Sequence, residues 1–88
     1  MLDIRWEDGF EASLVQAVPD AEVRAEVADH IEWLLARRAE ERSLVFNGYR
    51  VYRTNAFADT PKLRVYFKIE GEVVALCRIE RDESSPAW

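Results

Sequence analysis

The stretch that decides the fold of this 88-residue chain is Leu63-Arg64-Val65-Tyr66-Phe67-Lys68-Ile69. Apolar residues at its odd-numbered positions alternate with charged or amphipathic ones, which is the period of a strand with one buried face. The turn Glu70-Gly71-Glu72 leads into Val73 to Ile79, a run that is apolar on both sides through Val74 and Leu76. Such a run is typical of the well-covered middle of a sheet. These segments predict two adjacent strands.

The first eighteen residues predict a strand and a short helix. Between Leu2 and Trp6, apolar and charged residues alternate, which is typical of a short, half-buried strand. From Phe10 to Val18, an apolar residue recurs at every fourth position. This spacing predicts a helix over residues 9–18.

The longest amphipathic segment follows. An apolar stripe runs from Val23 to Leu35 at helical spacing, and most acidic side chains fall on the opposite side. Pro19 disfavours helical geometry at the residue before it, and Asp20 is a good cap for the next helix. We therefore predict a second helix from about residue 20 to residue 42.

The remaining segments return to a period of two. Tyr49 to Arg53 predicts a strand, and the preceding Asn47-Gly48 is a favoured hairpin dipeptide. Leu44–Phe46 could pair back as a small extra strand, but we favour a simple entry turn. Asn55 to Lys62 reads as the longest loop. The order strand, helix, helix, three strands predicts an α+β fold, an antiparallel meander with the helices on one face.

The same alternation predicts what each face of the sheet carries. We expect the helices to cover the apolar side chains Val51, Leu63, Val65, Phe67, Ile69, Ala75, Cys77 and Ile79. We expect the opposite face to carry interleaved basic and aromatic side chains, namely Arg50, Tyr52, Arg64, Tyr66, Lys68 and Arg78.

The charge and cysteine content exclude several classes of protein. The net charge of −5 argues against indiscriminate coating of nucleic acid, although residues 44–81 alone carry a net +3. The single cysteine excludes an internal disulfide framework and a zinc site rich in thiolates. No apolar run approaches the roughly 18 residues of a membrane span, and the first residues do not read as a signal peptide. We expect a cytoplasmic protein.

Common catalytic patterns are also missing. His30 lies in the acidic helix and Cys77 in an apolar strand, so a His–Cys nucleophilic pair is not expected. The glycines are isolated turn residues rather than a phosphate loop. Three acids share one flank of the long helix, and we interpret them as a solvated face rather than a cation site: Glu22, Glu26 and Asp29.

The order of elements and the segment from Leu63 to Glu83 resemble the RelE/ParE superfamily, the toxins of bacterial type II toxin–antitoxin systems. The shared pattern is a strand with an arginine at its second position, a Gly turn, and an apolar strand that ends near a basic residue. The resemblance implies a small RelE-like domain over residues 1–83, followed by a flexible tail, 84–88. Glu80 and Asp82 depart from it, because many members carry glycine or a basic residue there.

RelE-like members cleave mRNA in the ribosomal A site with basic residues and without a metal or cofactor. For that branch, the resemblance implies three catalytic residues: Arg50, Arg64 and Arg81. Arg64 matches the family's strand arginine, Arg50 a basic position on the preceding strand, and Arg81 lies near a basic position after the last strand. It implies substrate-binding roles for Tyr52, Tyr66, Lys68, Arg78 and Trp88.

The resemblance leaves two alternatives to this endoribonuclease. ParE-like members inhibit DNA gyrase without cutting anything, and a degenerate member would serve only as an antitoxin-binding module. Every alternative implies a cognate antitoxin protein as a partner. An exposed edge strand or the groove beside the helices is the expected docking surface.

Overall fold

The computed structural model describes residues 1–54 and 62–82. The elements follow one another as β1 (Asp3–Trp6), α1 (Phe10–Ala17), α2 (Ala21–Arg38), β2 (Leu44–Phe46), β3 (Tyr49–Arg53), β4 (Leu63–Glu70) and β5 (Val73–Arg81). This order confirms the predicted α+β class and both predicted helices. The loop predicted over Asn55 to Lys62 falls largely outside the described residues, and the predicted tail lies wholly outside them.

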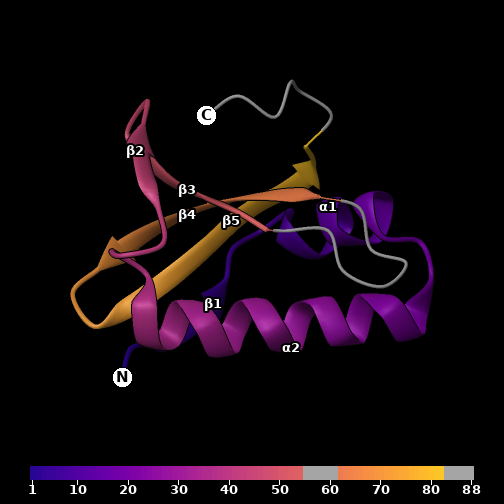
Figure 1. Ribbon diagram of the computed structural model, residues 1–88, viewed down its shortest axis with the longest axis horizontal. Coiled ribbons are helices and arrows are strands. Elements are labelled where there is room, and N and C mark those ends of the chain that lie inside the picture. Colours follow the sequence, from indigo (N-terminus) through magenta and orange to yellow (C-terminus); the bar gives the residue numbers. More distant parts are fainter. Residues whose placement is uncertain (55–61, 83–88) are drawn as a thin grey trace.

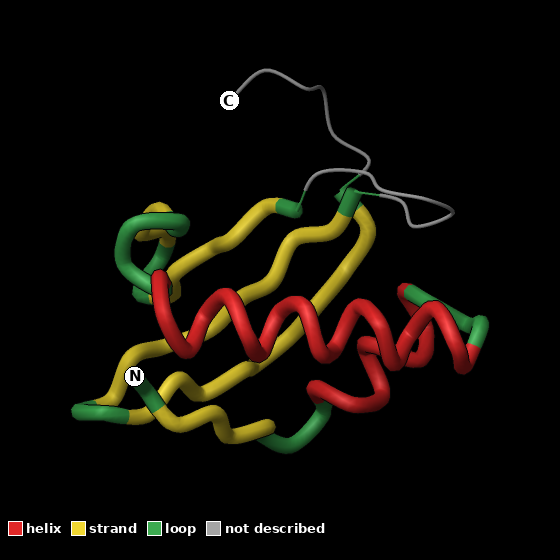
Figure 2. Tube along the Cα trace, turned by 60° about the horizontal axis from the view of Figure 1, so that its bottom comes forward, coloured by secondary structure: helices red, strands yellow, loops and turns green. Residues whose placement is uncertain are grey.

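The five strands form one mixed sheet in the order β1-β5-β4-β3-β2. Strands β2 to β5 pair antiparallel with their sequence neighbours, whereas β1 pairs parallel with β5. Both helices lie over the same face of the sheet (Figures 1 and 2). The other face, which we call the open face, carries neither helix.

A hairpin replaces the entry turn that we favoured before β3, so that prediction was wrong. β2 pairs with β3 from Leu44 opposite Val51 to Phe46 opposite Tyr49. Asn47 and Gly48 have φ values of 50° and 81°. Positive φ at both central residues is what a tight two-residue hairpin requires, which is why Asn-Gly is favoured there. Figure 1 shows the hairpin rising on the side of the sheet away from α2.

The start of α2 follows the predicted capping. The Asp20 carboxylate accepts hydrogen bonds from the backbone N–H groups of Glu22 and Val23, at 2.9 and 3.1 Å. These bonds satisfy two of the N–H groups that a helix leaves without partners in its first turn. The helix ends at Arg38 rather than near residue 42, and the chain leaves it through turns before β2.

The core lies between the helices and the sheet. Its largest fully buried side chains come from both helices and from β4 and β5, namely Phe10, Leu14, Val27, Ile31, Leu35, Leu63, Val65, Phe67, Val74, Leu76 and Ile79. Burying a side chain of this kind stabilises a fold by about 1.5–3 kcal/mol relative to leaving it exposed. This apolar layer fixes which face of each strand stays open.

The register of β3 corrects the facing predicted for Arg50 and Tyr52. Tyr52 lies opposite Val65 and Arg50 opposite Phe67, and both partners are core residues. Residues directly opposite one another on paired strands share a face. Arg50 and Tyr52 therefore lie on the helix face. Val51, predicted to face inward, lies on the open face.

A bulge in β5 corrects the facing predicted for Ala75 and Cys77. Tyr66 pairs with Arg78 while Phe67 pairs with Leu76, so Cys77 is left without an opposite residue. An extra residue of this kind interrupts the alternation of side chains along a strand. As a result Val74, Leu76 and Ile79 are in the core, and Ala75, opposite Lys68, lies on the open face with Cys77.

Candidate functional site on the open sheet face

Strand β4 places three of the predicted site residues on the open face. Arg64, Tyr66 and Lys68 alternate with the core residues of the same strand. Arg64 lies opposite Glu80 and Tyr66 opposite Arg78 on β5. The open face thus brings together four of the side chains that we predicted there, Arg64, Tyr66, Lys68 and Arg78.

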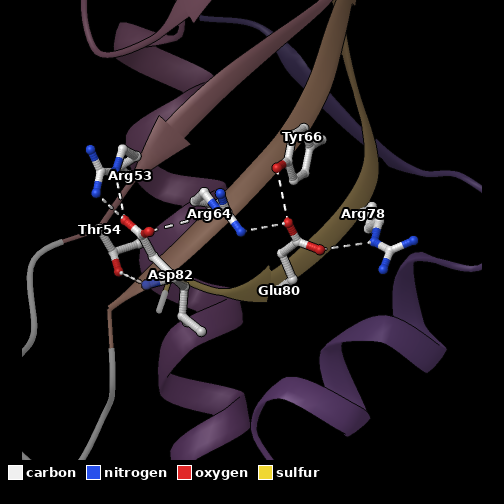
Figure 3. Close-up of polar contacts among 8 residues, drawn as sticks. Arg53, Thr54, Arg64, Tyr66, Arg78, Glu80 and Asp82 are labelled. Carbon is white, nitrogen blue, oxygen red and sulfur yellow. Dashed lines mark hydrogen bonds and ion pairs between the residues drawn. The ribbon is translucent and has the colours of Figure 1, made fainter. Parts of the chain in front are cut away.

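The centre of this group is the carboxylate of Glu80. The Tyr66 hydroxyl donates a hydrogen bond to Glu80 Oε1 at 2.9 Å, and Arg64 Nη2 forms an ion pair with the same oxygen at 2.9 Å. Arg78 Nε lies 3.4 Å from Oε2. We call these four residues the Glu80 cluster (Figure 3). Its carboxylate compensates part of the positive charge that the two arginines bring.

A second carboxylate neutralises Arg53, the last residue of β3. Asp82 follows β5, and its side chain is only 1% exposed. The Arg53 guanidinium contacts Asp82 Oδ2 through Nη2 at 2.5 Å and through Nε at 2.6 Å. Arg64 Nε lies 3.9 Å from the other carboxylate oxygen, and it has no hydrogen-bond partner among residues 1–54 and 62–82. Asp82 thus links the two arginines (Figure 3).

The three residues expected to be catalytic do not converge. Arg64 lies on the open face. Arg50 lies on the helix face, where its Nη1 donates to Ser43 Oγ at 3.2 Å. Arg81 is opposite the core residue Leu63, and its Nε donates to the Ala17 carbonyl at the end of α1, at 3.0 Å. The expectation that these arginines share one surface was therefore wrong. Successive side chains of a strand point to opposite faces, and the observed pairing places Arg50 and Arg81 on the helix face.

Tyr52 is a core residue and not part of an open binding surface. Its side chain is buried, and its hydroxyl is hydrogen-bonded to His30 Nε2 of α2 at 3.2 Å. Burial raises the pKa of Tyr52, and the nearby Arg42 opposes this shift. The polar tip of a buried tyrosine needs such a partner. Trp88, the other aromatic residue expected to contact substrate, lies outside the described residues.

A groove of about 510 Å³ opens between the β2–β3 hairpin and the open face. Its lining comprises Phe46, Asn47, Tyr49, Tyr66, Cys77, Arg78 and Glu80. Lys68 Nζ lies 4.9 Å from the centre of the Tyr49 ring, which is a cation–π distance. The groove thus combines three aromatic walls with one side of the Glu80 cluster, and its volume is in the range of small-ligand sites.

Two ionisable side chains that line the groove, Tyr66 and Cys77, are held in their neutral forms. Burial, followed by the bond to Glu80, raises the pKa of Tyr66, so its hydroxyl remains a donor at neutral pH. Burial is also the main reason that the pKa of the Cys77 thiol is raised. A protonated thiol is a poor nucleophile. The groove therefore offers hydrogen-bond donors and aromatic rings with which a ligand could be bound. Its thiol is not activated as a nucleophile.

The part of the chain that the structure describes offers no group of three or more His, Cys, Asp or Glu side chains that could hold a metal ion. None of its helices is long and apolar enough to cross a bilayer.

Sequence reasoning missed the parts played by Glu80, Asp82, Phe46 and Tyr49. The two acids stood out only as departures from the family pattern, and their pairing with arginines required the register of β4 and β5. The two aromatic residues became visible as groove walls only once β2 was known to be a strand. The Asn47-Gly48 dipeptide was the available signal for that hairpin.

No protein-family model and no curated protein sequence matches this chain. Among solved structures, a chain of the toxin–antitoxin complex RelBE2 from Mycobacterium tuberculosis is similar, with a TM-score of 0.69 and 16% sequence identity. The similar region covers 91% of this chain and 96% of that chain. At this identity the likeness concerns the fold, and it confirms the RelE-like fold that the β4–β5 motif implied.

Proposed function

We propose that the protein is the toxin of a toxin–antitoxin pair, and that it acts in the cytoplasm by binding a protein target rather than by cleaving RNA. The RelE-like fold and the solved toxin–antitoxin complex with a similar chain support the first part. A cognate antitoxin is the implied partner. The target that the resemblance names for a non-cleaving member is DNA gyrase.

The observation that carries this proposal is the neutralisation of the open-face arginines. Arg64 is held by Glu80 and approached by Asp82, while Arg50 and Arg81 lie on the helix face. Metal-free cleavage of RNA needs positive donors that are free to meet the charge developing on the phosphate. Donors already committed to carboxylates supply much less of that stabilisation.

The β2 edge is the surface that we propose for the antitoxin. Leu44, Val45 and Phe46 are 57%, 69% and 57% exposed, although all three are apolar. β2 is also the last strand of the sheet, so one side of its backbone is not paired within the sheet. An exposed apolar edge favours the addition of an extended strand from a partner.

The outer surface of α2 is the surface that we propose for the target. Trp33 is 56% exposed on this otherwise charged helix. The Arg37 guanidinium stacks over its ring at 4.6 Å, and Arg37 Nη1 donates to the Trp33 carbonyl. Tryptophan and arginine are the residue types that most often dominate binding energy at protein interfaces.

Inducible expression tests the proposal. We expect wild-type protein to arrest growth, and we expect coexpression of the partner antitoxin to restore it. Arg64→Ala is expected to remain toxic, whereas Trp33→Ala is expected to lose toxicity. Val15→Ala is the matched control, because Val15 is also an exposed apolar helix residue. If the wild-type protein is harmless when it is expressed without an antitoxin, the result would instead support the alternative of a module that only binds an antitoxin.

A second candidate function, ribosome-dependent RNA cleavage, is favoured by one observation. Arg64, Tyr66 and Arg78 share the open face around a carboxylate that could accept a proton. This candidate predicts cleaved mRNA in a cell-free translation reaction and loss of cleavage in Arg64→Ala. The first proposal predicts intact mRNA and, if gyrase is the target, inhibition of DNA supercoiling.

A further inference from the structure

The outer edge of β2 is not protected against pairing with another strand. Leu44, Val45 and Phe46 make up the whole strand, and each is more than half exposed. Folded proteins usually protect such an edge with a charged side chain, a proline or a bulge. β2 contains neither a charged residue nor a proline, and its register with β3 is regular. The edge is therefore open to a further strand.

The backbone of Val45 supplies the polar groups of this edge. Phe46 and Tyr49 flank the two-residue turn, and Val45 lies opposite Arg50. In such a hairpin the pair of residues next to the turn is hydrogen-bonded, and the following pair is not, because the two kinds of pair alternate along antiparallel strands. The N–H and C=O groups of Val45 therefore point away from β3, toward the side on which a further strand would lie.

The opposite edge of the sheet, formed by β1, is protected. The Leu2 N–H donates to the Ala36 carbonyl of α2 at 2.8 Å, so the helix covers the start of this edge. Further along β1, Arg5 forms ion pairs with Glu7 and Glu70. A covering helix and charged side chains are two of the ways in which proteins keep sheet edges from pairing. This contrast identifies β2 as the edge that is suited to a partner strand.

The residues of β2 are complementary to a second copy of the same strand. If two copies pair antiparallel about a two-fold axis at Val45, each Val45 faces Val45 of the second copy and each Leu44 faces a Phe46. The two Val45 residues can then exchange both backbone hydrogen bonds. Leu44 and Phe46 lie on the open face, opposite Val51 and Tyr49, so the pairing gathers four apolar side chains there. Two-fold symmetry of this kind is the commonest in homo-oligomers.

Electrostatic repulsion does not oppose this arrangement. Among the residues that lie directly opposite β2, Arg50 is the charged one. In the paired arrangement the two Arg50 residues are three interstrand spacings apart, roughly 14 Å. This separation exceeds the Debye length of about 8 Å at physiological ionic strength, so their repulsion is largely screened. Each Arg50 guanidinium is also held toward Ser43 of its own chain.

We propose that the free chain forms a two-fold symmetric dimer through the β2 edge, which joins the two five-stranded sheets into one. The interface is small, so we expect a reversible dimer with a dissociation constant in the micromolar range. A second copy and an antitoxin strand cannot occupy β2 together, so the dimer is a state of the chain without its antitoxin. The inference concerns the chain alone and does not depend on the proposed function.

Analytical ultracentrifugation of the purified chain tests the dimer between about 5 and about 500 μM, a range that brackets micromolar dissociation constants. We expect the apparent mass of the wild type to rise from 10.2 kDa toward twice that value. Val45→Lys brings two like charges together at the axis and is expected to weaken association at least about tenfold. The matched control is Val15→Lys, the same change at an exposed apolar residue of α1, which is expected to stay within about twofold of wild type.

A mixture of two variants tests the register. Val45→Glu alone is also expected to stay monomeric, whereas an equimolar mixture with Val45→Lys is expected to associate, because opposite charges then meet at the axis. A mixture that stays monomeric would overturn the proposed pairing.

The wild-type protein gives a reading that does not depend on a variant folding. In ¹⁵N NMR spectra of a dilution series, we expect the amide signal of Val45 to shift with concentration, because its N–H gains a partner across the axis. The signal of Glu72, in the turn between β4 and β5, is expected to stay in place. A wild type that is monomeric at the highest concentration, undiminished association of Val45→Lys, or an unmoved Val45 signal would overturn the proposal.

Discussion

The two faces of strands β4 and β5 differ in almost every physical respect. The helix face is formed mainly by buried apolar side chains, with Arg81 at the end of β5 as its charged exception. The open face carries paired charges that are partly exposed, and it borders an aromatic groove. The helix face therefore maintains the fold, while the open face can change its charge pattern without changing the fold. This division explains how a RelE-like fold can carry a neutralised arginine cluster.

The largest expected difference lies between neighbours on β4. Phe67→Ala is expected to lower the free energy of unfolding by about 3–5 kcal/mol, because it leaves a cavity in the core. Lys68→Ala, one residue further and exposed, is expected to cost at most about 1 kcal/mol, the size of its cation–π contact with Tyr49. Urea denaturation of both variants measures this contrast. Similar losses would mean that the two faces do not differ as described.

The next effect concerns the buried carboxylate. Asp82→Asn removes the charge that faces Arg53 while keeping the shape of the side chain. We expect a loss of about 2 kcal/mol, below the 3–5 kcal/mol typical of breaking fully buried pairs, because Arg53 is partly exposed. Glu80→Gln on the more exposed part of the open face is expected to lose less than about 1 kcal/mol. Equal losses would remove the distinction between these two carboxylates.

Alkaline pH is expected to weaken the helix face through Tyr52. Its folded pKa is raised above the ordinary 10.0 by burial, so its contribution to stability is full below about pH 10. That contribution is lost as the pH rises through the folded pKa, because the phenolate must be formed in a buried site. Tyr52→Phe is expected to lose about 1 kcal/mol at pH 7 and to show a smaller further loss at high pH. Thermal unfolding at pH 7 and above pH 10 measures both effects, and identical pH profiles would contradict this account.

The smallest expected effect is on the open-face thiol. The raised pKa of Cys77 lowers its thiolate fraction at pH 8 relative to an unfolded chain. Alkylation by iodoacetamide is expected to be several-fold slower in folded protein than in urea. Mass spectrometry over time follows the reaction. Faster alkylation of the folded protein would show that the groove activates the thiol.

The sequence predicted β4, both helices and the α+β class, because each rests on a clear local period. It did not predict the faces of β3 and β5. β3 consists of tyrosines and arginines around a single valine, and tyrosine and arginine are tolerated on either face of a sheet. The sequence is therefore consistent with either set of alternate side chains facing the helices. In β5, the bulge at Cys77 is set by pairing with Tyr66 and Phe67, which no local pattern reveals.

These errors of facing also limited the prediction of the site. Arg64, Tyr66 and Lys68 were placed on the correct face because the alternation of β4 is unambiguous. Arg78 was also placed correctly, because the bulge at Cys77 reverses the facing of β5 only before it. Arg50 was placed on the open face by the ambiguous alternation of β3, and Arg81 was placed beside it by analogy with the family pattern. The strand pairing puts both on the helix face. The neutralising roles of Glu80 and Asp82 depend on cross-strand distances, which the sequence does not contain.

The proposed function depends most on the claim that carboxylates of the chain itself disable the open-face arginines for RNA cleavage. Primer extension on mRNA recovered from a cell-free translation reaction tests this claim directly. We predict that wild-type protein leaves the transcript intact at concentrations that arrest growth in cells. Transcripts cut within codons by wild-type protein, and left whole by Arg64→Ala, would contradict the account.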